Sequence, residues 1–118
     1  MKHFLFLIFS FFLFLFNIQA QNHSLILLYE QQLSNATYDK ARVDFMNKLA
    51  AEYLTTTTEV EEKYWDKPMT YAKDASALAL KINYKIGLGE AYTNIANIFR
   101  KEGNSVFAAA YDYKAQKV

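Results

Sequence analysis

The amino-terminal segment is far more apolar than the surface of any small folded domain. Lys2 and His3 precede Phe4–Phe16, a run that contains only Phe, Leu and Ile apart from Ser10. A membrane-spanning helix needs about 20 consecutive apolar residues, whereas the apolar centre of a secretory signal peptide needs about 7 to 15. The length of this run therefore predicts a signal peptide that directs export.

The residues after the apolar run fit a cleavage site. Polar residues interrupt the run, and Ala20 supplies a small residue at the expected position. We therefore expect residues 1–20 to be removed after Ala20 and residues 21–118 to reach the periplasm or cell envelope. The alternative is an uncleaved segment, lengthened by Ile18, that holds the chain at the membrane interface.

Composition favours helices and excludes several kinds of site. The 118 residues include 3 Gly, 1 Pro and no Cys, too few turn-forming residues for an architecture of strands. Lys and Arg total 13 and Asp and Glu total 12, so no basic surface suited to nucleic acid is expected. Without Cys, and with imidazole only at His3 and His23, the sequence predicts no disulfide, metal or cofactor. The expected fold class is all-α, with antiparallel helix pairs.

Apolar residues recur three and four positions apart in five segments, which is the spacing of one helix face. We expect helices over residues 23–34, 38–54, 69–82, 88–101 and from 106 onward. In the first of these, Ser24 is the expected cap, and Ile26 and Leu27 leave a short strand as the alternative. The polar side of the second helix is expected to carry Lys40, Asp44, Asn47, Lys48 and Glu52.

The joint between the second and third helices is marked by a change of residue type. Thr55–Thr58 are β-branched and predict the end of the second helix. Asp66 is placed to cap the third helix, with Pro68 tolerated in its first turn.

The two later joints carry residues that accept unusual backbone conformations. Asn83 suits a left-handed terminating position, and Gly87 is expected to be a flexible joint before the fourth helix. Gly103 is expected to end that helix, with Asn104 or Ser105 as the cap of the last one.

The last two expected helices carry the spacing of a known helical repeat. The matching residues are Tyr92, the pair Ile95-Ala96, Phe99, and then Ala108 and Ala115 in the partner helix. This pattern resembles the tetratricopeptide repeat (TPR). Ala96 facing Ala108 lets two antiparallel helices approach closely, while Tyr92 and Phe99 fill the space between neighbouring pairs. Asp112 stands where the repeat has an aromatic residue, so a slight rotation of the last helix is expected.

The resemblance divides the exported chain into three parts. Residues 21–37 form an amino-terminal helix and linker, residues 38–86 a degenerate TPR-like pair with an inserted loop at 55–66, and residues 87–118 a TPR pair, incomplete at its carboxyl end. The segments Asp44–Ala50, Tyr71–Ala75 and Gly89–Ala96 together resemble the exported repeat segment that begins many bacterial sensor histidine kinases and related regulators. The whole is expected to be a short α-solenoid.

The resemblance also implies a binding surface. Tetratricopeptide arrays bind peptides on the concave face lined by the first helix of each pair, which here corresponds to Glu90, Thr93, Asn94, Asn97, Arg100 and Lys101. The amides of Asn94 and Asn97 suit the backbone of an extended peptide, and Arg100 or Lys101 suits a carboxylate. The alternative is that these residues form the solvated side of an amphipathic helix.

No arrangement typical of an enzyme is found. Gly87–Gly89 follows a helix rather than a strand, so it fails the context of a dinucleotide-binding loop. Glu59, Glu61 and Glu62 offer carboxylates to a cation, but such clusters are more typical of a solvated face. Trp65 is expected to pack against the helix pair, and the alternative is an exposed anchor for a partner.

The sequence therefore predicts a non-catalytic module that binds protein or peptide at the sensory front of a bacterial signal-transduction protein. The alternatives are a free-standing periplasmic adaptor or assembly scaffold, and a secreted enzyme whose catalytic domain lies beyond Val118. Arrays of fewer than about three repeats leave apolar surface uncovered. Phe107 and Tyr111 are expected to lie on such a surface, so we also expect the isolated segment to be marginally stable or to self-associate.

Overall fold

The described part of the chain is entirely helical. The structure is a computed structural model that describes residues 2–56 and 65–118, with the side chains of residues 14–22 outside the description. Its helices are α1 (Lys2–Asn35), α2 (Asp39–Thr56), α3 (Asp66–Lys81), α4 (Lys85–Lys101) and α5 (Ser105–Lys117). The prediction of an all-α fold is confirmed.

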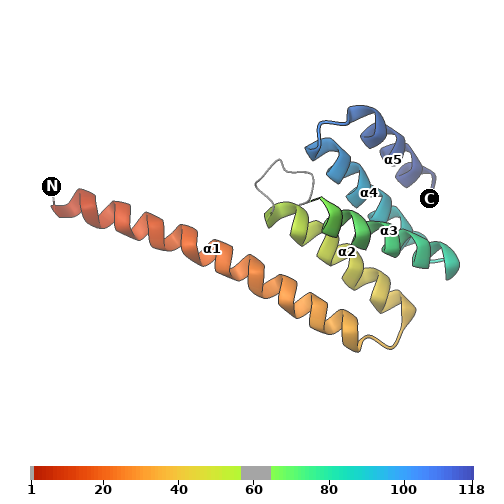
Figure 1. The fold of residues 1–118 in the computed structure, drawn as a ribbon, viewed down its shortest axis with the longest axis horizontal. Helices are drawn as coiled ribbons and strands as arrows, with labels where there is room; N and C mark the ends of the chain where they lie inside the picture. Colours follow the sequence, from red (N-terminus) through yellow and green to blue (C-terminus); the bar gives the residue numbers. More distant parts are fainter. Residues whose placement is uncertain (1, 57–64) are drawn as a thin grey trace.

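Consecutive helices run antiparallel and pack side by side (Figure 1). Each helix contacts the next one along the chain, and α2 also contacts α4. The first half of α1 extends beyond the other helices, as Figure 1 shows. The packed part of the molecule is therefore centred on α2, α3 and α4.

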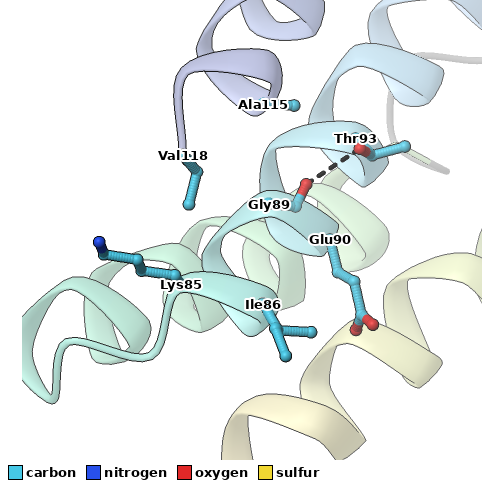
Figure 2. A pocket seen from close by; sticks show the side chains of 7 residues that line it. All are labelled: Lys85, Ile86, Gly89, Glu90, Thr93, Ala115 and Val118. Atoms are coloured by element: carbon cyan, nitrogen blue, oxygen red, sulfur yellow. Dashed lines mark hydrogen bonds between the residues drawn. The ribbon is translucent and has the colours of Figure 1, made fainter.

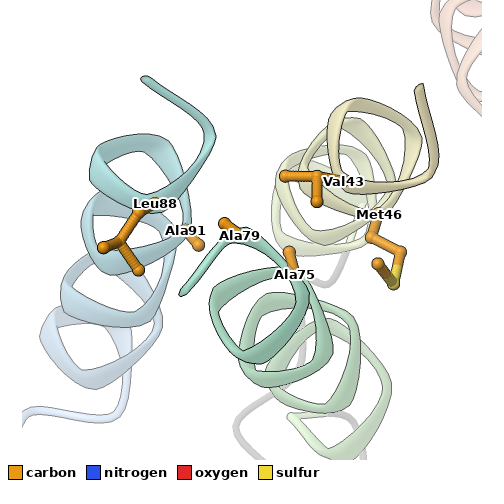
Figure 3. Close-up of a cluster of buried hydrophobic side chains, with 6 residues drawn as sticks. All are labelled: Val43, Met46, Ala75, Ala79, Leu88 and Ala91. Atoms are coloured by element: carbon orange, nitrogen blue, oxygen red, sulfur yellow. The ribbon is translucent and has the colours of Figure 1, made fainter. Parts of the chain in front are cut away.

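Two buried clusters hold these central helices together. One cluster contains Val43, Met46, Ala75, Ala79, Leu88 and Ala91, and Figure 3 shows the alanines of α3 between the side chains of α2 and α4. The second contains Ala50, Leu54, Trp65, Ala72, Ile95 and Ile98. Small side chains on α3 let α2 and α4 approach it from opposite sides, because an alanine adds little bulk to the interface. Trp65 is 7% exposed, which confirms that it packs in the core.

The α3–α4 and α4–α5 connections are the same turn made with different residues. Asn83 (φ 55°) and Gly103 (φ 81°) each adopt the left-handed conformation that ends a helix. In both turns the next amide donates back into the finished helix, Tyr84 to the oxygen of Ala79 and Asn104 to that of Phe99, each at 2.8 Å. Both residues were expected to end helices, and both predictions are confirmed.

The expected start of the first helix is wrong. α1 is continuous from Lys2 to Asn35, so Ser24 lies inside a helix instead of capping one. The same finding overturns the strand alternative for Ile26 and Leu27, since the segment is helical and Ile26 is buried against the rest of the protein.

The boundaries around the predicted inserted loop also shift. α2 continues through Thr55 and Thr56, whose hydroxyls donate to the carbonyl of Glu52 at 2.9 and 3.1 Å and so satisfy the end of the helix. Trp65, rather than Asp66, occupies the cap position of α3 and makes no side-chain cap hydrogen bond. Residues 57–64, which include Glu59, Glu61 and Glu62, lie outside the described residues.

Gly87 is not a flexible joint. It lies in the first turn of α4 and is buried, with the space around its α-carbon filled by Val43 and Tyr84. A β-carbon at this position would come within 2.6 Å of Val43 Cγ1 and of Tyr84 Cδ1. Glycine is therefore needed here for the close approach of α4 to α2, and not for backbone freedom.

The last helix is attached by one side only. Ala108 is its buried residue, while Tyr111 lies against Tyr92 and Phe99 of α4 with ring centroids 5.9 and 5.8 Å apart. Phe107 stacks on Phe99 at 5.2 Å but remains 54% exposed. The carboxyl-terminal pair is thus joined by an aromatic contact that leaves much of α5 open to solvent.

Candidate functional site

Hydrogen bonds join α2 and α4 along their whole length. Asn47 is 4% exposed and its Nδ2 donates to the carbonyl of Gly87 at 2.9 Å. Asn94 Nδ2 in turn donates to the carbonyl of Asn47 at 3.1 Å and lies 3.5 Å from its Oδ1. The buried amide of Asn47 and the partly buried amide of Asn94 thus each have a partner on the neighbouring helix, as polar groups removed from water require.

Both ends of this interface carry a further polar contact. At the amino-terminal end, Tyr84 donates its hydroxyl to Asp44 Oδ1 at 2.9 Å, and this bond raises the pKa of the Tyr84 hydroxyl. At the carboxyl-terminal end, Lys101 Nζ donates to the carbonyl of Leu54 at 2.7 Å. We call these contacts and the two asparagine bonds the α2–α4 polar seam. Since amino-terminal residues meet at one end and carboxyl-terminal residues at the other, α2 and α4 are parallel.

The seam uses two of the six residues that the sequence assigns to a peptide-binding face. Asn94 and Lys101 bond to α2. Arg100 bonds instead within its own helix pair, with Nη2 2.6 Å from Asp112 Oδ2 and Nη1 2.6 Å from Asn97 Oδ1. Asp112, the residue that departs from the repeat pattern, therefore has an ionic role in holding α5.

The remaining candidates lie on the outer face of α4. Glu90 and Thr93 are exposed, and Thr93 Oγ1 donates only to the carbonyl of Gly89 in its own helix at 2.9 Å. Ile86, which was not singled out, belongs to the same face and is 70% exposed. Together with the half-buried Asn97, these side chains form a mixed apolar and polar strip that we call the α4 face.

A hollow of about 450 Å³ adjoins the α4 face (Figure 2). Its lining includes Lys85, Ile86, Glu90 and Thr93 from α4 and Ala115 from α5. Figure 2 shows Ala115 and Val118 above α4, with the side chain of Glu90 pointing away from both of them. The structure therefore brings Glu90, Thr93 and Ala115 to one surface concavity.

The repeat-packing residues lie where α4 meets its neighbours. Ile95 and Ala96 are 1% and 0% exposed, and Ala108 on α5 is buried. Tyr92 and Phe99 contact Tyr111. Ala115 is half-buried and lines the hollow.

A separate cluster of titratable side chains joins α1 to α2 and α3. Glu30 Oε1 accepts from the hydroxyls of Tyr53 at 2.6 Å and Tyr71 at 3.4 Å, and it lies 3.6 Å from Lys67 Nζ. Lys67 also donates to the Tyr53 hydroxyl at 3.0 Å, and the two tyrosine rings stack with centroids 5.9 Å apart. We call these four residues the Glu30 cluster.

Electrostatics favour the charged carboxylate within this cluster. The hydrogen bond from Tyr53, together with the charge of Lys67, holds the pKa of Glu30 below its ordinary value despite partial burial. Burial and the bond to Glu30 raise the pKa of Tyr53, and burial and the charge of Glu30 raise that of Tyr71. The bond to Tyr53 raises the pKa of Lys67. At neutral pH, Glu30 and Lys67 are therefore charged and the tyrosines are neutral, an arrangement suited to holding α1 in place.

The Glu30 cluster borders a hollow of about 460 Å³. Its side chains bond to one another and so join the helices. Glu30 and Tyr71 line this hollow with Arg42 and Asp74. Arg42 lies 3.8 Å from Asp39, so the cation on the rim already faces a carboxylate. No set of three or more His, Asp or Glu side chains suited to a metal ion occurs in residues 2–56 and 65–118.

The sequence-based placement of Asn47 is wrong. Asn47 was expected on the polar side of α2 but is buried, because it shares a face with Val43, Ala50 and Leu54. Those positions are four before, three after and seven after Asn47, which is the spacing of one helix face. The position of a polar residue among apolar residues of one helix face could therefore have indicated that Asn47 is buried.

Comparison with known proteins found no relative, since no family model, no curated protein and no solved structure matches the chain. In the part of the chain that the structure describes, no helix combines the length and hydropathy needed to cross a bilayer.

Proposed function

We propose that this chain is an exported, non-catalytic module that binds a peptide or protein segment, built as a short α-solenoid of the tetratricopeptide type. The observation that carries the proposal is the parallel packing of α2 and α4, each followed by an antiparallel partner helix. Successive repeats of a helical solenoid stack in this way, with their first helices side by side. The seam fixes the relative position of two such helices.

The α4 face is the proposed binding surface. Asn94 and Lys101 already bond to α2, and Arg100 bonds to Asp112 on α5. Thr93 and Asn97 bond within α4 itself, so together with Glu90 they are the polar side chains of this strip that remain on the side offered to a ligand. Ile86 adds an apolar contact next to them. An extended peptide that places alternating apolar and polar groups on a helix face suits such a mixed strip.

The amino-terminal segment supports export. Every apolar side chain described in Phe4–Leu13 is exposed, whereas Ile26 and Glu30 contact the packed helices. Cleavage after Ala20 would remove the exposed apolar part and keep the part of α1 that packs. We propose that the released module acts in the periplasm or cell envelope, at the sensory front of a bacterial signalling protein.

A displayed library of random 12-residue peptides tests the binding function. We expect the purified chain to select peptides that bind the α4 face, because that face is open and has both apolar and polar groups. Thr93→Lys should weaken their binding, since a long cation would obstruct the strip. The matched control is Thr70→Lys, at an exposed position on α3. Equal peptide binding by the two variants would show that the selected peptides do not bind the α4 face.

The intact mass of the product recovered from cell envelopes tests export. A mass equal to residues 21–118 would support cleavage after Ala20 and a free adaptor. A much larger product that contains this segment would support the sensory front of a longer protein. A product that retains residues 1–20 would contradict cleavage.

A further inference from the structure

A second hollow of the α4–α5 pair adjoins the one beside the α4 face, with which it shares Lys85 and Val118, and it has a different chemistry. Its volume is about 450 Å³, and its lining includes Leu88 and Tyr92 of α4 and Tyr113 of α5. Hollows of about 300 to 1,000 Å³ with aromatic walls are typical of sites for small molecules. Lys85, Lys114 and Lys117 line the same hollow. It is therefore both aromatic and cationic.

In the described part of the chain, the lysines of this hollow have no Asp or Glu partner. Within residues 2–56 and 65–118, no Asp or Glu side chain lines the hollow, and none of the three lysines forms an ion pair. Residues 81–118 contain six Lys or Arg and three Asp or Glu residues, and one of those acids, Asp112, pairs with Arg100. The side chains of this segment therefore carry more positive than negative charge.

Aromatic rings hold two of these ammonium groups in place. Lys114 Nζ lies 4.7 Å from the ring centroid of Tyr111 and 5.8 Å from that of Tyr92. Lys117 Nζ lies 5.1 Å from the ring centroid of Tyr113. A ring face attracts a cation without neutralising its charge or using its hydrogen-bond donors. The ammonium groups therefore remain able to bind an anion.

We propose that this hollow is a binding site for a small organic anion, with an aromatic or apolar body against Tyr92, Tyr113 and Leu88 and a carboxylate or phosphate on the lysines. The first hollow provides the contrast, because it has one lysine, Lys85, and a carboxylate, Glu90. Charge-assisted bonds to an ammonium favour an anion at the lysine-rich hollow only. None of the four residues of the α4 face lines this hollow, so the proposal does not depend on peptide binding at that face.

Matched naphthalene probes test the proposal in solution. The purified chain is titrated at low salt with 1-naphthoate, 1-naphthyl phosphate, neutral 1-naphthamide and inorganic phosphate, while backbone amide shifts are followed by NMR. We expect at least one of the two aromatic anions to bind saturably, with shifts concentrated at α4 and α5. Added salt should weaken binding, since the lysines are exposed to solvent.

Two variants and one control assign the binding to the lysines. Lys114→Gln with Lys117→Gln should weaken binding of the anionic probe by about tenfold, because two charged donors are lost. Lys85→Gln alone should weaken it less and keeps the test valid if the double variant misfolds. The control is Lys48→Gln with Lys73→Gln, in which Lys48 also lies over aromatic rings, 5.5 Å from Tyr29 and 5.3 Å from Phe45.

The probes also separate the source of the negative charge. Binding of the carboxylate alone, the phosphate alone or both would support the site and identify the preferred head group. Equal binding of 1-naphthamide would overturn the role of charge, and equal binding of inorganic phosphate would overturn the role of the aromatic walls. Unchanged affinity in both lysine variants would refute the site.

Discussion

The second helices of the two pairs, α3 and α5, have similar alanine content but very different burial. On α3, Ala72, Ala75 and Ala79 are all fully buried, because α2 and α4 pack on either side. On α5, Ala108 is buried while Ala109 and Ala110 are exposed, because α4 is the only helix that α5 contacts in the described part of the chain. An alanine-rich helix face is therefore a core element only when neighbours cover both of its sides.

Of the changes considered, Trp65→Ala should cause the largest loss of stability, because Trp65 lies in the core formed by α2, α3 and α4. Trp65 packs between α2, α3 and α4, and truncation of a buried Trp costs about 3 to 5 kcal/mol of unfolding free energy. Urea denaturation followed by circular dichroism measures this loss. Tyr113→Ala on α5, where the side chain is 60% exposed, should change stability by less than about 0.5 kcal/mol. Similar losses in both variants would refute the contrast.

Gly87→Ala and Gly89→Ala should shift stability in opposite directions. A β-carbon at Gly87 would clash with Val43, and such overpacking costs about 1 to 3 kcal/mol. A β-carbon at Gly89 meets no atom within 4 Å, so the better helix propensity of Ala should stabilise the chain by about 0.5 to 1 kcal/mol. Thermal melting of the two variants makes the comparison. Stabilisation by Gly87→Ala would contradict the tight approach of α2 and α4.

Ala96→Leu should loosen α5 and leave α2 and α3 packed. Ala96 is 0% exposed, and a larger side chain there costs about 1 to 3 kcal/mol through overpacking. Hydrogen exchange measured by mass spectrometry should rise mainly in Ser105–Lys117. The control is Ala109→Leu, at an exposed position of α5. Unchanged exchange in Ala96→Leu would mean that the assigned repeat register is wrong.

Asn104→Ala should have a smaller and more local effect. The Asn104 Oδ1 accepts from the amide of Phe107 at 3.2 Å and caps α5. Loss of such a cap costs about 0.5 to 2 kcal/mol. Faster amide exchange in the first turn of α5 is the expected result. Ser105→Ala should leave that turn unchanged, and the reverse pattern would show that Ser105 is the cap.

Glu30→Gln should make the smallest change, visible as a difference in pH dependence. The folded chain lowers the pKa of Glu30 from 4.5, so its charged form stabilises the fold above that value and the contribution is lost as pH falls through the folded pKa. The wild type should therefore exceed Glu30→Gln in melting temperature near pH 7, and the gap should close as the pH falls from 4.5 through the lowered pKa of the folded state. Glu52→Gln is the control. A constant gap would exclude a role for the Glu30 charge.

Helix periodicity predicted α2, α3 and α4 well because their apolar residues recur regularly, three and four positions apart. Ala72, Ala75 and Ala79 stand three and four apart, and the helix they define is present. The boundaries shifted where packing outweighed local signals, as at Trp65, which begins α3 without a side-chain cap. Periodicity identifies residues that share a face but not the helix that the face meets.

The candidate site was less predictable for the same reason. Asn94, Arg100 and Lys101 have the same donors whether they face a peptide or a neighbouring helix, and only the fold shows their partners in Asn47, Asp112 and Leu54. Gly87 was predicted to be a flexible joint because the residue that it approaches closely, Val43, lies 44 positions earlier in the sequence and gives no local signal. Such long-range partners are not encoded in local spacing.

The polar seam determines how α2 and α4 can move relative to each other. A slip of one helical turn, about 5.4 Å along the axis, would separate every donor in the seam from its acceptor at once. A change in tilt costs less, because a few degrees of rotation shift each bond by only a fraction of its length. A force or ligand acting on α4 would therefore change the angle between α2 and α4 more readily than it would shift one helix along the other.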